Sequence, residues 1–295
     1  GTYIIGTTGD YTSIAAASND LMSRGVCSPV VFNIQSGVYN ESISLLGVPG
    51  ASLTNTITFQ SATGNAADVN ITYASADAND NFVFWFNGAD YVSLKNLSLT
   101  NTGSTYAGVI VISGSANYNT IDHCILTGKA DITSSANTYV VNNKTGLDNY
   151  NTLSNNVINN GSRGIYWYGS SSSSLENGSV ITGNTINNSG YYALYSYYTG
   201  SSLISGNTIN QTSGSTYSTF YGYYIGYADT VTVTKNVANI LGTSTVYGMY
   251  LYYCDGFASK QNLVANNMIS ATSVSATATI YGLRGYYANY TQFLN

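Results

Sequence analysis

One short segment repeats along this chain, and its period constrains the fold more than any other feature. The segment is an asparagine followed by a short run of alternating apolar residues. It begins at positions 96, 156, 184, 207, 236 and 267, with His123 in the equivalent place after the first. The intervals are 27, 33, 28, 23, 29 and 31 residues. A period of about 20–50 residues is typical of a solenoid, in which each repeat packs on the next.

A second segment type interleaves with the first. It starts at a small residue and continues with aromatic or β-branched residues, from Gly108, Gly164, Ala193, Gly222, Gly248 and Gly282, while residues 137–141 fill the remaining gap. Two or three strands per repeat, with Gly, Ser and Asn corners and no helical period, predict an all-β fold. We expect a right-handed parallel β-helix, because parallel crossovers within one sheet are nearly always right-handed.

The N-terminal part differs from the repeats. Residues 12–25 combine an N-cap signal, an alanine-rich body and a final glycine, which predicts one short helix that covers the first coil. Further strands are expected at 30–35, 56–60, 69–73 and 82–86. We therefore expect one domain over 1–295, with a cap and irregular coils in 1–95 and regular coils in 96–295. The last segment has no capping pattern, so we expect a longer natural chain or a partner at this end.

The repeated asparagines suit tight corners. Asn tolerates the left-handed backbone conformation, and stacked Asn side chains can form a hydrogen-bonded ladder. We expect the six asparagines to form one column. His123, the only histidine, is expected in that column beside Cys124, with its ring in place of a corner amide.

The composition excludes several classes of function. Only 7% of the residues are charged, and the 8 Lys and Arg residues are scattered, which argues against nucleic-acid binding and a polybasic membrane surface. No apolar run reaches the ~18 residues that a membrane span requires. Cys27, Cys124 and Cys254 are too widely spaced for a disulfide framework or a metal site, so free thiols are expected. The low charge and the excess of polar uncharged residues favour a secreted or cell-surface protein.

Two aspartates are candidates for a site. Asp229 and Asp255 each lie seven residues after a strand glycine (229−222 = 7; 255−248 = 7), so they should share one corner on adjacent coils. The pair is either a solvated turn pair, a Ca²⁺ site, or an acid–base couple assisted by Arg284. Asn289 holds the same offset in the next coil, which suits a corner column.

The tyrosines form the most pronounced pattern. Twenty of the 29 lie after residue 162, and many occupy the second and fourth positions after the small residue that opens each strand. With a period of two, these side chains face outward and stack from coil to coil. The ligand-binding residues predicted on this basis are Tyr166, Tyr168, Tyr195, Tyr197, Tyr224, Tyr250, Tyr252 and Tyr286. Such columns either stabilise the sheet alone or offer flat apolar ring faces to a ligand.

Two family resemblances accompany these patterns. The segments at 1–14, 31–41 and 55–61, together with the repeats at 95–290, resemble secreted right-handed β-helix proteins of Bacteroidota, which implies export by a type IX system. Gly9-Asp-Tyr, Gly37-Val-Tyr-Asn-Glu and the segment 88–102 are similar to pectin methylesterases. That resemblance implies an oxyanion-binding Gln where Tyr106-Ala-Gly-Val-Ile stands. Asp131 matches one catalytic Asp, whereas the nucleophilic Asp and the Arg have no match, so Asp131 is expected to be a turn residue.

These observations predict a non-catalytic extracellular β-helix protein, adhesin-like or assembly-forming. The expected partners are a polysaccharide or cell-surface glycan, or copies of the chain itself, without a cofactor. The alternative is a polysaccharide-active enzyme of the lyase, glycosidase or esterase type, with Asp229, Asp255 and Arg284 as catalytic residues.

Overall fold

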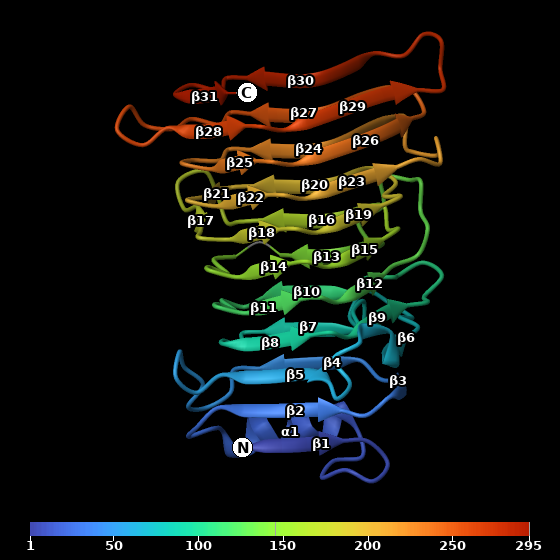
Figure 1. Cartoon of the computed structure of the whole chain (residues 1–295), viewed down its shortest axis with the longest axis vertical. Helices are drawn as coiled ribbons and strands as arrows, with labels where there is room; N and C mark the ends of the chain where they lie inside the picture. Colours follow the sequence, from blue (N-terminus) through green and yellow to red (C-terminus); the bar gives the residue numbers. More distant parts are fainter. Residues whose placement is uncertain (145, 295) are drawn as a thin grey trace.

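The chain forms a parallel β-solenoid in the computed structural model, which describes residues 1–144 and 146–294 (Figure 1). Three parallel sheets run along its length, and every described pairing between their strands is parallel. The first sheet contains β1 (Thr2–Ile5), β2 (Val30–Ile34), β5 (Ile57–Ser61), β8 (Val92–Lys95), β11 (Thr120–Asp122), β14 (Thr152–Ser154), β18 (Val180–Thr182), β22 (Leu203–Ser205), β25 (Thr232–Thr234), β28 (Asn262–Ala265) and β31 (Thr291–Leu294).

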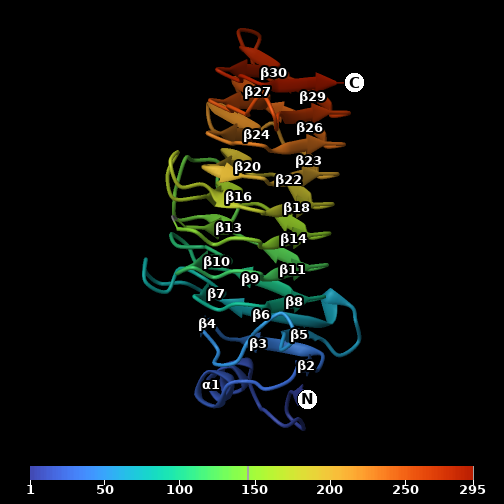
Figure 2. The ribbon, with the colours of Figure 1, turned by 90° about the vertical axis from the view of Figure 1, so that its left-hand side faces the viewer.

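The second and third sheets complete each coil. The second sheet contains β3 (Gly37–Asn40), β6 (Val69–Tyr73), β9 (Ser98–Asn101), β12 (Ile125–Thr127), β15 (Val157–Asn159), β19 (Thr185–Asn187), β23 (Thr208–Gln211), β26 (Val237–Gly242) and β29 (Met268–Ser273). The third sheet contains β4 (Ile43–Leu46), β7 (Phe84–Asn87), β10 (Ile110–Ser113), β13 (Tyr139–Asn143), β16 (Arg163–Tyr168), β20 (Tyr192–Tyr197), β24 (Thr219–Gly226), β27 (Thr245–Tyr252) and β30 (Ile280–Tyr286). Figure 2 shows the third-sheet strands one above another along its left-hand side.

The predicted period fixes which side chains fill the interior. The central residue of each short strand points inward, so stacked strands build continuous apolar columns. One column in the first sheet consists of Ile121, Leu153, Ile181, Ile204, Val233 and Val264, all of them buried. The predicted solenoid agrees with this architecture, and the strands expected in 30–86 are also present.

The predicted N-terminal helix is α1 (Ile14–Arg24), which lies at the N-terminal end of the solenoid and contacts β4 (Figure 2). Ser13 caps it by accepting a hydrogen bond from the Ala16 N–H, and Gly25 ends it with a φ of 70°. Its buried face comprises Ile14, Ala17, Ser18 and Leu21. A short 3₁₀ helix (Ala66–Asp68) and a two-stranded sheet of β17 (Glu176–Asn177) and β21 (Thr199–Gly200) complete the described elements.

The asparagine ladder exists, but its register corrects the sequence prediction. Asn156, Asn184, Asn207, Asn236 and Asn267 form one column between the first and second sheets. The Oδ1 of Asn207, for example, accepts from both the N–H and the Nδ2 of Asn184 at 3.0 and 2.9 Å. Asn96 lies outside this column, because strand pairing aligns it with His123 and Asn155 instead.

Leu97 and Cys124 therefore occupy the first ladder positions, and the N–H of Cys124 donates to Oδ1 of Asn156 at 2.8 Å. His123 is not in the ladder. It points outward beside Asp122, with its Nδ1 2.8 Å from the carboxylate. The left-handed corner residues are those one position earlier, such as Asn96, His123 and Asn155, with φ near 52–55°. The left-handed corner conformation and the ladder hydrogen bonds, predicted for one residue, therefore belong to two successive residues, such as Asn155 and Asn156.

The remaining sequence predictions on the scaffold concern the thiols and the C-terminal coil. Cys27, Cys124 and Cys254 are free thiols; Cys27 is exposed and the other two are buried. Strands β29, β30 and β31 form the outer edges of the three sheets, and the core-facing Leu283 and Phe293 are exposed there. None of the helices in the described residues is long and apolar enough to cross a membrane.

Candidate binding face

The outer face of the third sheet carries tyrosine columns from β16 to β30. Strand register places Tyr166 beside Tyr195, Tyr195 beside Tyr224, and Tyr224 beside Tyr250. We call this the second column; it ends at Arg284. A third column contains Tyr168, Tyr197, Gly226, Tyr252 and Tyr286. The eight tyrosines that the sequence singled out therefore share one sheet face. Whether they bind a ligand stays a prediction.

The structure adds a first column that sequence reasoning missed, which runs through Arg163, Tyr192, Tyr221, Tyr247 and Tyr281. It was missed because strict alternation fails in these strands. In β24, Tyr221 and Tyr224 both lie on the outer face, with the buried Gly222 and Tyr223 between them. A Cβ on Gly222 would lie 2.5 Å from the Gly248 carbonyl oxygen, so the close approach of adjacent coils requires a small residue here. The glycine that opens each of these segments could have indicated the column, because a glycine inside a strand often marks the close approach of another backbone.

We call the three columns together the tyrosine face. Within it, rings stack along the solenoid axis. Tyr221 lies 4.7 Å from Tyr247 at an interplanar angle of 8°, and Tyr195 lies 4.6 Å from Tyr166 at 10°. These spacings follow from the ~4.8 Å separation of paired strands. Tyr195 and Tyr250 are only 8% exposed as a result. Stacking therefore covers most ring faces, and the columns present ring edges and hydroxyls outward rather than the flat faces that the sequence pattern suggested.

A fourth stack of tyrosines borders this face at the corners after β20, β24, β27 and β30. Tyr227 stacks on Tyr253 at 5.0 Å, and Tyr253 on Tyr287 at 4.8 Å. These corner residues, with Tyr198, have positive φ between 45° and 56°. A bulky residue in this conformation is strained, so the aromatic stack holds the corner in place. A separate corner trio of Tyr91, Tyr118 and Tyr150 lies in earlier coils, before strands of the first sheet.

Burial perturbs the hydroxyls of several tyrosines in the face. Desolvation raises the pKa of Tyr192, Tyr195 and Tyr224 far above the usual value, and the neighbouring phenols add to the shift. A protonated phenol donates as well as accepts a hydrogen bond. The face is therefore a regular array of neutral donors and acceptors on a rigid sheet.

Two arginines lie on the same face. The guanidinium of Arg163 lies 4.3 Å from the centroid of the Tyr166 ring. That of Arg284 lies 4.9 Å from the Tyr281 centroid and donates from Nη1 to the Tyr247 hydroxyl at 3.1 Å. Beside the first site, Asn142, Asn143, Lys144, Tyr166 and Tyr168 line a depression of about 340 Å³.

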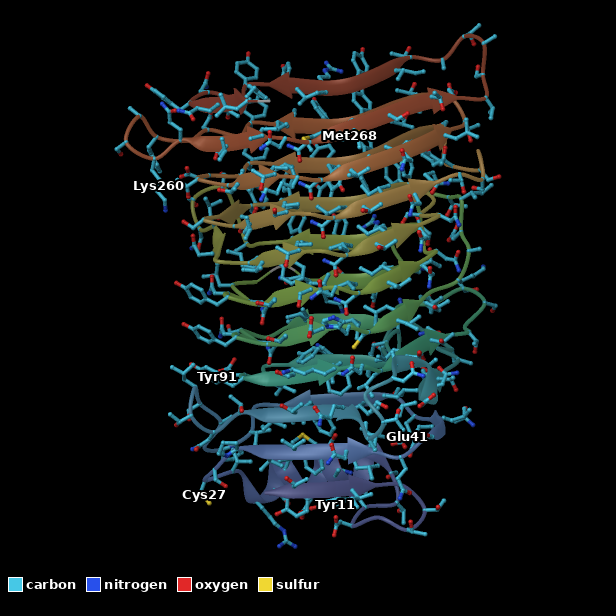
Figure 3. The ribbon with its side chains drawn as sticks, viewed as in Figure 1. Tyr11, Cys27, Glu41, Tyr91, Lys260 and Met268 are labelled. Carbon is cyan, nitrogen blue, oxygen red and sulfur yellow. The ribbon has the colours of Figure 1, made fainter. Side chains whose placement is uncertain are left out.

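The structure places Asp229 and Asp255 together, as their spacing predicted. Both line a small cavity of about 150 Å³ at the corner between the third and first sheets. Burial raises the pKa of Asp229. The positive charge of Lys260 lowers this pKa, and the negative charge of Asp255 raises it further. Lys260 lies on a projecting loop (Figure 3). Its Nζ donates a hydrogen bond to the Ser201 hydroxyl at 3.0 Å. Asp255 accepts from the Asn289 Nδ2 at 2.7 Å, as expected for a corner column.

Arg284 does not belong to this corner, which corrects the predicted catalytic set. It occupies an outward position of β30, in register with Tyr250, whereas Asp255 lies in the connection after β27. The basic group that acts on Asp229 is Lys260. Within the described residues, no group of three or more His, Cys, Asp or Glu side chains is arranged to hold a metal. The Ca²⁺ site at Asp229 and Asp255 therefore stays an untested prediction.

Asp131, the residue that matched the esterase pattern, acts as a turn residue. Its carboxylate accepts from the Thr133 N–H at 2.8 Å and from the Thr138 hydroxyl at 2.6 Å. Both bonds close the local loop between β12 and β13. This geometry agrees with the structural role that its sequence context predicted.

A buried acidic pair could not be recognised from the sequence pattern. Glu176 is fully buried inside the solenoid and accepts from Trp167 Nε1 at 2.6 Å, Ser179 Oγ at 2.9 Å and Asn143 Nδ2 at 2.8 Å. Burial raises its pKa to about 8, and burial also raises the pKa of Asp148 to about 6. Glu176 lies in the two-residue strand β17 and Asp148 in a connecting segment, and both segments are rich in polar residues, so no periodic pattern identified either residue as interior.

Comparisons with known proteins support the fold. Residues 146–284 match a family model described as a right handed beta helix region. Together with the parallel topology, this match shows an all-β solenoid of the right-handed β-helix type, as the repeat predicted. No curated protein sequence matches the chain.

Three solved structures illustrate the structural likeness. The pectin methylesterase from Aspergillus niger has 16% identity and a TM-score of 0.53, covering 99% of this chain and 89% of its own. The pectin methylesterase from carrot has 12% identity and a TM-score of 0.53, with 99% and 88% covered. The alginate lyase from a Paenibacillus species has 14% identity and a TM-score of 0.53, with 92% and 97% covered. At these identities, the likeness concerns the fold alone.

Proposed function

We propose that the chain is a secreted or cell-surface β-helix protein that binds glycan through the tyrosine face without cleaving it. The observation that carries this proposal is the alignment of three tyrosine columns over β16, β20, β24, β27 and β30. A sheet that holds its aromatics by mutual stacking loses little conformational entropy when a ligand binds. The fold is also that of polysaccharide-active enzymes such as the pectin methylesterases and the alginate lyase. Export by a type IX system remains the expectation of the sequence resemblance.

The contacts differ from those of an exposed aromatic platform. Because the rings stack on one another, a glycan meets phenol hydroxyls, ring edges and the Arg163 and Arg284 side chains. Hydroxyl groups of sugars are matched by such neutral donors and acceptors. The ~4.8 Å repeat along the axis gives a long ligand equivalent contacts on successive coils. An extended polysaccharide therefore fits better than a small sugar.

The test removes hydroxyls while keeping the stacked rings. A variant with Tyr168, Tyr197, Tyr252 and Tyr286 changed to Phe keeps the third column packed, and its melting temperature should stay close to that of the wild type. We expect retention on a glycan array or affinity gel to fall at least tenfold. The matched control changes Tyr91, Tyr118 and Tyr150, the separate corner trio, to Phe and should bind normally. Unchanged binding by the face variant would show that the columns only stabilise the sheet.

Self-association through the same face is the second mode of use, since the low charge of the chain offers little repulsion. Sedimentation velocity over a hundredfold concentration range distinguishes it. Concentration-dependent growth that the Phe variant abolishes would assign the face to assembly rather than to glycan.

A catalytic role at Asp229 and Asp255 is the second candidate function, favoured by the shared cavity and by Lys260 nearby. Asp255 is already held by Asn289, and Asp229 is partly desolvated, so the two carboxyl groups differ in environment. Wild type and an Asp229→Asn variant should be incubated with each glycan that binds. Release of reducing ends or unsaturated products by the wild type alone would establish this second function.

A further inference from the structure

The charges of this protein are segregated along the chain. Ten of the 13 acidic residues precede residue 150, whereas the later part contains Glu176, Asp229 and Asp255. Of these three, Glu176 is buried and the other two lie at the corner cavity. Four of the 8 basic residues lie after residue 150: Arg163, Lys235, Lys260 and Arg284. The later coils are thus not acidic, although the whole chain has a net charge of −5.

The tyrosine face itself carries positive charge only. Strands β13, β16, β20, β24, β27 and β30 contain no Asp or Glu. Among the residues that the structure describes, the ion pairs are Arg24–Asp20 and His123–Asp122, so both arginines of the face lack a carboxylate partner. The buried Nε of Arg163 has no hydrogen-bond partner at all. Lys144 adds a third cation at the depression beside Arg163 and lies 5.4 Å from the Trp85 ring.

Geometry orders these cations along the solenoid axis. Arg163 opens β16 and Arg284 lies in β30, four pairings further along the third sheet. At ~4.8 Å per pairing, the two guanidinium groups are about 19 Å apart along the axis. The tyrosine columns fill the interval between them. A ligand that uses both arginines must therefore be an extended chain with negative charges at separated positions.

We propose that the ligand of the tyrosine face is an anionic polysaccharide, which runs along the columns and places acidic groups at Arg163 and Arg284. This proposal rests on the proposed function and names the chemical class of the glycan. The guanidinium fork matches carboxylate and sulfate oxygens, and stacking on tyrosine holds it in a fixed orientation. Phenol hydroxyls in between contact the neutral hydroxyls of the sugar rings.

The experiment compares polymers that share a sugar backbone and differ in charge. Binding of the full chain to polygalacturonate and to its fully methyl-esterified form is measured by calorimetry at low salt. Dextran sulfate and dextran form a second charged and neutral pair. The variant is Arg163→Gln with Arg284→Gln, and the control is Lys235→Gln, at a corner between the first and second sheets. Unchanged circular dichroism and melting temperature establish that each variant is folded. If the double variant does not fold, either single arginine variant replaces it in the experiment.

We expect the wild type to bind at least one charged polymer tenfold or more above its neutral partner, with affinity falling as salt rises. The double variant should lose that tenfold preference and bind the charged and the neutral polymer alike, and Lys235→Gln, outside the tyrosine face, should keep the wild-type preference. Arginine-dependent binding of polygalacturonate identifies carboxylate as the group, and arginine-dependent binding of dextran sulfate identifies sulfate. Equal binding of charged and neutral polymers, or no effect of the arginines, overturns the anionic class. If binding to the neutral polymer still depends on the tyrosine hydroxyls, the proposed function survives that result; if no polymer binds, both proposals fail.

Discussion

Replacing Glu176 by Gln tests whether a buried carboxyl group governs the pH dependence of stability. Glu176 has a pKa of about 8 in the folded chain, against 4.5 for an ordinary Glu, chiefly because burial disfavours the charged form. The folded state therefore binds more protons than the unfolded state between these values. Its contribution to stability is fully present below about pH 4.5 and is lost as the pH rises toward 8.

The size of this effect follows from the shift. A difference of about 3.5 pKa units corresponds to about 5 kcal/mol across the whole window, as an upper limit. Asp148, with a pKa of about 6, adds a loss in the same direction between about pH 4 and 6. The melting temperature of the wild type should therefore decrease steadily from pH 4 to pH 8.

Gln can replace Glu176 without leaving its partners unsatisfied. Its Oε1 can accept from Trp167 Nε1 and Ser179 Oγ, as the carboxylate does. The side-chain NH₂ group of the new glutamine then faces Asn143, whose buried Oδ1 has no hydrogen-bond partner. If the side-chain amide of Asn143 rotates by 180°, this Oδ1 replaces Nδ2 and accepts a hydrogen bond from the glutamine. We expect Glu176→Gln to be more stable than the wild type at pH 8 and to have a flatter pH profile.

The assay is thermal unfolding by circular dichroism in matched buffers from pH 4 to pH 8.5. Asp255→Asn, an exposed carboxylate held only by Asn289, is the control and should follow the wild-type profile. Asp148→Asn should remove the lower part of the decrease alone. A Glu176→Gln profile as steep as that of the wild type would refute the assignment of the pH dependence to this buried group.

Three further predictions concern the scaffold. Asn207→Ala should lower the free energy of unfolding by about 2–4 kcal/mol, since it leaves the Asn184 N–H and the Ile181 carbonyl unpaired, whereas Asn210→Ala on the outer face should cost under 1 kcal/mol in denaturant titrations. Gly226→Ala should displace the Tyr197 ring, which lies 2.4 Å from the position of the new Cβ, and should reduce the near-ultraviolet dichroism of tyrosine. Gly282→Ala, with open space around its Cβ, should not. Spectrophotometric titration should show Tyr192, Tyr195 and Tyr224 protonated until the chain unfolds in alkali, because burial raises their pKa; reversible ionisation of all 29 tyrosines near pH 10 in the folded state would contradict this.

The repeat alone determined the class of fold and most of the tyrosine face. Period-two alternation within a strand and a period of about 28 residues between coils are both set by backbone geometry, so they are written directly into the sequence. Tyr166, Tyr195 and Tyr250 could be assigned to one outer column for this reason. The helix over 14–24 was equally local, because Ser13 and Gly25 mark its ends.

Tertiary structure decided what depends on exact register and on burial. A shift of one residue moves Asn96 and His123 out of the ladder, and no local property distinguishes Asn155 from Asn156. The first tyrosine column, with Tyr192 and Tyr221, appears only where close contact between coils interrupts the alternation.

The interior position of Glu176 also comes from packing, whereas the alternation after Gly282 already gave Arg284 an outward position in register with the tyrosines. A residue outside the repeated segments has no counterpart at the same offset in the neighbouring repeats. Its surroundings are set by the coils stacked above and below it, about 23–33 residues away, and only the folded chain brings these together.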